Sequence, residues 1–108
     1  MAVMVLFRSA KVDKALYDAI MQAVDLERDP PPGGLTHACS FDSDGVLVVD
    51  VWETREQFQA FLETRLAPVF ARLKVEVDPP VVLDTHSLYA TDEVDRYKLK
   101  HPPGLSAA

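Results

Sequence analysis

The stretch that decides the fold covers residues 35–58 and reads LTHACSFDSDGVLVVDVWETREQF. It holds two apolar segments, residues 35–41 and 46–52, on either side of the short polar run 42–45. Asp, Ser and Gly favour tight turns, because they form local side-chain hydrogen bonds or tolerate positive φ. We therefore predict a β-hairpin here. Thr54 with Gln57 three positions later fits a capping box, which predicts that a helix begins directly after the second strand.

The segments outside this stretch continue the pattern. Residues 2–8 are apolar at both odd and even positions, which is typical of a strand buried on both faces. Residues 12–24 carry apolar side chains at spacings of three and four, which predicts a helix that ends before Pro30. A second helical stripe covers 58–73, and Pro68 should kink or restart this helix after Ala67. Residues 81–89 form the last predicted strand.

The predicted order is strand, helix, strand, strand, helix, strand. This order favours an α+β protein with the ferredoxin-like βαββαβ fold, in which two helices cover one face of a four-stranded antiparallel sheet. We expect one domain over residues 1–90 and a polar C-terminal tail over residues 91–108. Because the strands are apolar on both faces, the second face needs a cover, and we expect a second copy of the chain to supply it as a homodimer.

Composition excludes several classes of function. The chain has 108 residues, with 11 Lys+Arg against 17 Asp+Glu and a formal net charge of −6, which argues against nucleic-acid binding. The longest apolar run, residues 2–7, is far shorter than the ~20 residues that span a membrane. No secretory signal is visible, and the single Cys39 has no internal disulfide partner. We expect a cytoplasmic protein.

The hairpin also predicts a candidate catalytic pair. If Asp42 opposes Gly45, His37 lies opposite Asp50 and Leu35 opposite Trp52, with facing Cβ atoms ~5 Å apart. A carboxylate beside a histidine orients the ring and raises its basicity, so the pair is a candidate general base. A purely structural contact is the alternative. On this register the other face, with residues 47, 49 and 51, suits contact with the helices, and the His37 face turns toward a partner subunit or an internal cavity.

Other candidates share this region. His86, on the last predicted strand, is a possible proton donor, with a strand-end position near solvent as the alternative. Four further side chains are candidate substrate contacts: Trp52, Phe7, Phe41 and Cys39. His37, Asp50 and His86 could in principle bind a metal, but no short ligand-spacing motif predicts such a site. Glycine-rich phosphate loops and the common hydrolase and zinc-protease motifs are absent from the sequence.

Residues 48–62, VVDVWETREQFQAFL, resemble the strand-to-helix signature of the antibiotic biosynthesis monooxygenase-like proteins, which belong to the dimeric α+β barrel superfamily. Residues 31–37 and 66–68 are similar to small actinobacterial members of that group. The resemblance implies a dimer whose two sheets form a barrel, with a pocket in each subunit between sheet and helices. Haem-binding members carry a histidine on the second helix, where this chain has Phe61, and an asparagine on the first strand, where it has none.

Residues and resemblance together suggest a small dimeric enzyme acting on an aromatic or polyketide-type metabolite. The His37–Asp50 pair would remove a proton, and the resulting anion would be oxygenated, cyclised or isomerised. We expect no resident cofactor, with an external reduced flavin as the other possibility. The alternatives are a non-catalytic protein that binds a hydrophobic small molecule in the same pocket, and a structural protein in which the polar pair fixes the dimer register.

Overall fold

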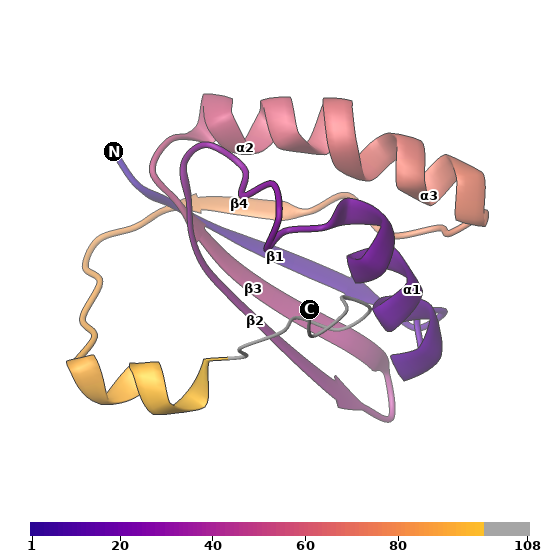
Figure 1. Cartoon of the computed structure of the whole chain (residues 1–108), viewed down its shortest axis with the longest axis horizontal. Helices are drawn as coiled ribbons and strands as arrows, with labels where there is room; N and C mark the ends of the chain where they lie inside the picture. Colours follow the sequence, from indigo (N-terminus) through magenta and orange to yellow (C-terminus); the bar gives the residue numbers. More distant parts are fainter. Residues whose placement is uncertain (99–108) are drawn as a thin grey trace.

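The computed structural model describes residues 1–98, so the last ten residues of the predicted tail lie outside the described part of the chain. The elements follow the predicted order (Figure 1). They are β1 (Val3–Ser9), α1 (Lys14–Val24), β2 (Gly34–Asp42), β3 (Gly45–Trp52), α2 (Arg55–Phe61), the π-helical turn η1 (Leu62–Leu66), α3 (Ala67–Leu73), β4 (Val81–Asp84) and the 3₁₀ segment η2 (Asp92–Tyr97).

The four strands form one antiparallel sheet in the order β2-β3-β1-β4. Each helical connection therefore joins two strands that have a third strand between them, which is the split βαβ arrangement. The helices α1, α2 and α3 lie on one side of this sheet, and the short segment η2 lies apart from them (Figure 1). The predicted fold class, ferredoxin-like α+β with a four-stranded antiparallel sheet, is confirmed.

The helix side of the sheet carries the core. Along β1 the buried positions are Val3, Val5 and Phe7, and the Phe7 ring meets Phe58 of α2 edge-on at 6.0 Å. Along β3 the same face holds Val46, Val48, Asp50 and Trp52. The prediction that residues 47, 49 and 51 contact the helices is wrong. Odd and even positions of β3 both carry mainly apolar side chains, so the alternation of apolar and polar residues could not show which face of the strand meets the helices.

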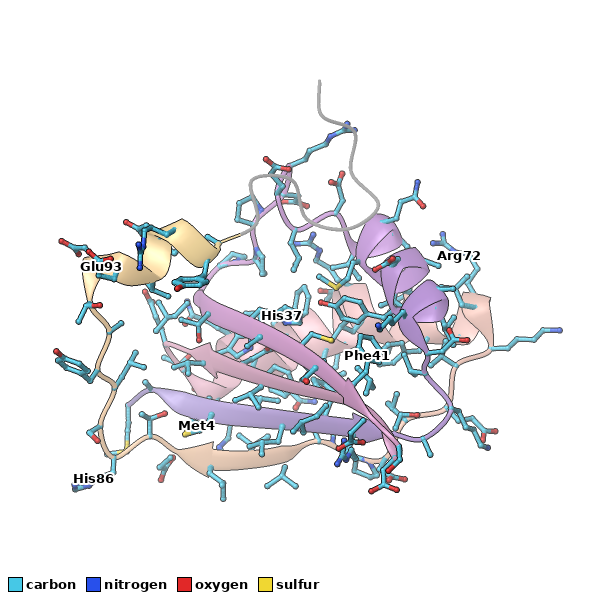
Figure 2. All side chains as sticks on the ribbon, turned by 90° about the horizontal axis from the view of Figure 1, so that it is seen from below. Met4, His37, Phe41, Arg72, His86 and Glu93 are labelled. Carbon is cyan, nitrogen blue, oxygen red and sulfur yellow. The ribbon has the colours of Figure 1, made fainter. Side chains whose placement is uncertain are left out.

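The opposite face of the sheet has no helix over it. We call it the open sheet face, and Figure 2 views the molecule from below, with Met4 labelled on β1. Val81 and Leu83 on this face are each 52% exposed. Strand register places these apolar side chains together on it: Met4, Leu6, Leu47, Val49, Val51, Val81 and Leu83.

The helices α1 and α2 each begin at a side-chain cap. Asp13 accepts a hydrogen bond from the Leu16 amide at 2.8 Å at the start of α1. Thr54 accepts one from the Gln57 amide at 3.1 Å, and its hydroxyl donates to the Gln57 side chain at 3.0 Å. Each cap satisfies an amide that the first helical turn leaves without a partner. The predicted cap at Thr54 is confirmed.

The second helical segment changes register before Pro68. In η1 the amide of Ala67 donates to the carbonyl of Leu62, five residues back, instead of four. The Thr64 hydroxyl donates to the carbonyl of Ala60 at 2.7 Å. Pro68 then lies in the first turn of α3, where a missing amide hydrogen is tolerated. The predicted restart near Ala67 is therefore confirmed, in the form of a π-turn.

The last strand is shorter than predicted. β4 ends at Asp84, and the chain turns away from the sheet at Thr85, whose amide bonds to the carbonyl of Ala2 at 2.9 Å. The strand predicted over residues 81–89 is thus wrong beyond residue 84, because the pairing of β4 with β1 stops at the Val3–Asp84 pair. Within residues 1–98, no helix is both long and apolar enough to cross a membrane.

Candidate active site

A cavity of about 220 Å³ lies between the sheet and the helices. Its apolar walls come from β1, β3, α1 and the α2–α3 segment, and the α1–β2 loop borders its open end. The residues that line it are Phe7, Val12, Tyr17, Ile20, Met21, Val24, Leu26, Pro31, Gly34, Leu35, Thr36, His37, Val46, Val48, Asp50, Trp52, Phe61, Leu66, Phe70 and Val77. The polar side chains among them are confined to β2, β3 and one position of α1.

His37 and Asp50 meet on the β2–β3 wall of this cavity. The hairpin turn opposes Asp42 to Gly45, and this register sets His37 opposite Asp50. The Nδ1 atom of His37 is 2.7 Å from a carboxylate oxygen of Asp50. The His37 side chain is 30% exposed and that of Asp50 only 8%. The predicted pair is confirmed as a contact, and it faces the internal cavity beneath the helices.

Asp50 is held by a second donor. The indole N–H of Trp52 donates to its other carboxylate oxygen at 3.3 Å. The Trp52 ring packs against Phe58 and Phe61, with ring centroids 5.7 Å and 5.0 Å apart. Both oxygens of this buried carboxylate thus have hydrogen-bond donors, as a polar group in an apolar surrounding requires. Asp50 is thus a fixed acceptor that orients the imidazole ring.

Tyr17 completes a chain of polar groups that the sequence analysis missed. Its hydroxyl lies 2.7 Å from Nε2 of His37, and the two rings are nearly parallel, at 10°. Burial raises the pKa of the Tyr17 hydroxyl well above its usual value near 10, and the neighbouring Cys39 and Asp50 add to the effect. The available signal was the helical spacing 17, 20, 21 and 24, which places Tyr17 on the same stripe as Ile20, Met21 and Val24.

The other predicted contacts divide into two groups. Phe7 and Trp52 line the cavity. Phe41 and Cys39 do not, although both are neighbours of Tyr17: the Phe41 ring meets it edge-on at 5.8 Å. Burial raises the pKa of the Cys39 thiol, so this sulfur is a poor nucleophile at neutral pH.

His86 does not reach the cavity. It follows the end of β4 and is exposed at an outer corner of the molecule, far from His37 (Figure 2). Its expected position on the last strand is wrong for the reason given above: the strand ends at Asp84. His37, Asp50 and His86 therefore do not come together as a group of metal ligands. Among residues 1–98, no group of three or more His, Cys, Asp or Glu side chains could hold a metal ion.

The loop between α1 and β2 forms the mouth of the cavity. Leu35 at this end is 46% exposed and lies at a β-bulge, so Gly34, rather than Leu35, pairs with Trp52. The predicted Leu35–Trp52 pair is wrong, because register was extended past the bulge. Gly33 has φ 87°, and a Cβ atom there would collide with the Gln57 side chain, so the loop fits closely onto the start of α2.

Arg65 connects this loop to the helices through hydrogen bonds. Its guanidinium donates to the carbonyls of Val24 at 2.6 Å and Asp29 at 2.7 Å, at the end of α1 and in the loop. The same group lies 5.4 Å above the ring of Phe61. The π-turn contains Arg65, so the register change in the second helix and the fixing of the cavity mouth involve the same residue.

The residues present do not fit a haem. Phe61 is buried against Trp52 where haem-binding relatives are expected to have a histidine. Both ring nitrogens of His37 already have partners. The cavity is also smaller than the ~300–1,000 Å³ of sites for drug-sized ligands, and a porphyrin is larger than most such ligands.

Neither a family model nor a curated protein matches the sequence. Solved structures do match the fold. One was solved as a 'putative antibiotic biosynthesis monooxygenase' from Chloroflexus aurantiacus, with a TM-score of 0.59, 14% identity, and coverage of 83% of this chain and 98% of that chain. Another is SnoaB, a cofactor-independent oxygenase from Streptomyces nogalater, with a TM-score of 0.57, 15% identity, and coverage of 81% and 94%.

A third is a MhuD variant with two manganese protoporphyrin IX molecules bound per active site, with a TM-score of 0.53, 14% identity, and coverage of 84% of this chain and 100% of that chain. At these identities the likeness shows the fold alone. That fold is the one shared by the antibiotic biosynthesis monooxygenase-like proteins.

Proposed function

We propose that the chain is a small monooxygenase-like enzyme that removes a proton from an aromatic or polyketide-type metabolite bound in the cavity. The observation that supports this most directly is the His37–Asp50 contact of 2.7 Å on the polar wall of an otherwise apolar cavity. A histidine held by a buried carboxylate is a common general base, because the carboxylate stabilises the imidazolium that forms.

The proposed chemistry begins at an acidic O–H or C–H bond of the ligand. His37 takes the proton, and the bonding electron pair stays on the ligand as an enolate or phenolate. Such an electron-rich anion can react with dioxygen as co-substrate, or it can cyclise or isomerise without it. Trp52 and Phe7 would form the apolar walls against the ligand ring.

The cavity lining favours a small neutral ligand. Among the described residues that line it there is no Lys or Arg, so a carboxylate or phosphate would lack a partner for its charge. The volume of about 220 Å³ suits one or two rings. We therefore propose a phenolic or enolisable ligand of that size.

The cofactor requirement is part of this proposal. We propose that the chain holds no resident cofactor, and that any reduced flavin would act as an externally supplied co-substrate. The same lining offers no cationic side chain to anchor the phosphates of a nucleotide cofactor in the cavity. A cytoplasmic location, where such co-substrates are present, completes this part of the proposal.

We also propose that a second copy of the chain covers the open sheet face. The apolar side chains on this face are contiguous across three strands, and contiguous apolar patches of this kind mark interaction sites. Arg8, the charged residue of β1, is neutralised by Asp42 through two hydrogen bonds of 2.9 Å and 3.2 Å. A two-fold dimer would bury the same patch from both subunits.

Exchange of the acidic C–H protons of 2-tetralone in heavy water tests the proposed function, because exchange requires only proton abstraction. We expect the protein to accelerate this exchange and His37→Ala to slow it by ~100-fold. Tyr89→Phe, at an exposed position, is the matched control and should exchange as fast as the wild type. Equal rates for His37→Ala and the wild type would contradict the assignment. Dioxygen uptake by the same mixture then separates oxygenation from isomerisation.

A non-catalytic binding protein is the second candidate, and one observation favours it. Nε2 of His37, the atom that would accept the proton, already has Tyr17 as its partner at 2.7 Å. In this case 2-tetralone would bind without accelerated exchange, and His37→Ala would change only its affinity.

A further inference from the structure

The direction of the hydrogen bonds through the site is fixed at one end by Asp50. An ionised carboxylate only accepts, so Nδ1 of His37 must carry the hydrogen that is donated to it over 2.7 Å. A neutral imidazole with its hydrogen on Nδ1 has a bare lone pair on Nε2. The hydroxyl 2.7 Å away therefore donates, and the order is Tyr17 to His37 to Asp50.

This order leaves the Tyr17 oxygen as the acceptor of the cavity that lies directly beside Nε2 of His37. Its hydroxyl hydrogen is donated to His37, and the oxygen has two lone pairs, so one remains for a ligand donor even with Cys39 as a hydrogen-bond partner. Tyr17 lines the cavity from α1, whereas the two ring nitrogens of His37 are already engaged by Asp50 and Tyr17. A ligand hydroxyl in the cavity thus has an open acceptor at Tyr17 and none on the imidazole.

We infer that Tyr17 is the residue that contacts the ligand hydroxyl and that it relays the proton from the ligand to His37. This inference rests on the proposed function and names the route by which its base is reached. The ligand O–H bond breaks as a new O–H bond forms on Tyr17, and the original Tyr17 hydrogen forms an N–H bond on Nε2 of His37. The electron pair stays on the ligand as a phenolate, and Asp50 faces the resulting imidazolium.

The relay also accounts for two features of the site. The Tyr17 ring stacks on the His37 ring, at 10° between planes, and Cys39 is a further side-chain hydrogen-bond partner of the Tyr17 hydroxyl, so both contacts keep this hydroxyl next to Nε2. Direct capture by His37 would instead require Tyr17 to swing away, which would give up the contact at 2.7 Å and the edge-on packing against Phe41.

4-Nitrophenol is the probe that tests this relay, because its anion is coloured and its ionisation when bound can be read directly. 4-Nitroanisole, which has no hydroxyl, is the matched ligand. In the wild type we expect bound 4-nitrophenol to ionise at a lower pH than in water. Tyr17→Phe should weaken 4-nitrophenol binding roughly five- to tenfold and return the ionisation midpoint toward the value in water, with 4-nitroanisole affinity unchanged. Tyr89→Phe is the control and should match the wild type.

A second substitution keeps the test open if Tyr17→Phe folds poorly. Incorporating 3-fluorotyrosine at position 17 keeps the ring and the hydroxyl but makes the hydroxyl a stronger donor. We expect the ionisation midpoint of bound 4-nitrophenol to move to lower pH, a shift that a merely structural tyrosine would not produce.

The outcomes separate the relay from the proposed function. If the wild type does not promote ionisation of 4-nitrophenol, or if His37→Gln leaves it unchanged, the proposed function fails and the relay with it. If His37→Gln abolishes the effect but Tyr17→Phe ionises bound 4-nitrophenol as well as the wild type or better, the base stands and the relay is overturned. Tyr17 would then only cover Nε2 of His37 and would carry no proton.

Discussion

Asp50 is the residue on which the other polar groups of the cavity depend. It is buried and accepts from two donors, the imidazole of His37 and the indole of Trp52. Removing such an acceptor leaves each donor without a partner in a site with little access to water. Its effect should therefore appear in the stability of the fold as well as in the chemistry.

We expect Asp50→Ala to lower the free energy of unfolding by roughly 1–3 kcal/mol, because it leaves two donors unpaired. Urea denaturation monitored by the fluorescence of Trp52, the only tryptophan, measures this directly. Asp84→Ala is the control. That carboxylate is exposed and lies 3.8 Å from Arg55, and an exposed ion pair of this length contributes little to the free energy of unfolding. Equal loss in both variants would mean that Asp50 is not held as described.

The raised pKa of Tyr17 leads to a separate prediction about the stability of the protein at alkaline pH. Burial raises its pKa in the folded state above the value near 10 of the unfolded chain. Its contribution to stability is thus fully present below that unfolded value and is lost as the pH rises toward the folded one. From about pH 9 to about pH 11 we expect the unfolding free energy of the wild type to fall more steeply than that of Tyr17→Phe. Parallel curves would show that Tyr17 ionises freely in the folded protein.

Sequence could predict the His37–Asp50 contact because a turn of known type sets the register of a hairpin, and His37 lies close to that turn. The same reasoning failed at Leu35, beyond the bulge. A bulge adds one residue to a strand without changing the apolar pattern by which the strand is predicted. Tyr17 was missed for another reason. Its contact with His37 joins α1 to β2 across the cavity, and no local pattern reports contacts between distant segments.

At the scale of elements, the α1–β2 loop and the second helical segment act together through Arg65. A guanidinium can satisfy two carbonyls at once, and here these belong to Val24 and Asp29. The terminal carbonyls of a helix otherwise lack partners within it. The arrangement joins the mouth of the cavity to the helix that forms its opposite wall.

We expect Arg65→Met to lower the free energy of unfolding by roughly 1.5–3 kcal/mol, as for loss of hydrogen bonds to a charged donor. Hydrogen exchange should show the larger change in the amides of residues 25–34, because the loop loses its anchor. Arg72→Met, an exposed arginine of α3, is the control and should leave both measurements unchanged. Unaltered protection of residues 25–34 in Arg65→Met would contradict this role.

The helices and β4 show which features of an element can be predicted from the sequence. The cap at Thr54 was predictable because it depends on residues three positions apart. The break before Pro68 was predictable from the missing amide hydrogen, but its form as a π-turn was not. The end of β4 was missed because residues 85–89 contain no proline or glycine that would mark the end of a strand, whereas the pairing of β4 with β1 stops at Asp84.

At the scale of the whole molecule, the open sheet face is the feature on which the proposed dimer depends. The helices α1, α2 and α3 form one layer and cover one face of the four-stranded sheet, so the other face, which is apolar, has no helical cover from them. The choice of face could not be made from the sequence, since both parities of β1 and β3 are apolar.

We expect a dimer mass in light scattering at micromolar concentration. Val49→Lys, which places a charge in the middle of the open sheet face, should shift the protein toward the monomer. Ala60→Lys, on the exposed side of α2, is the control and should remain dimeric. A monomer mass for the wild type would reject the proposed dimer without affecting the account of the cavity.

The π-turn of five residues also contains one residue more than a regular helical turn would need. Because its hydrogen bond reaches five residues back rather than four, the wide turn takes up this extra residue, and the helical faces on either side keep their directions. Deleting Thr64 would let α2 continue into α3 as a regular helix with Val69 still turned toward the core. Deleting a residue from the regular part of α3 would instead rotate everything after it by about 100°. The segment around Thr64 should therefore accept the loss of one residue better than α3 does.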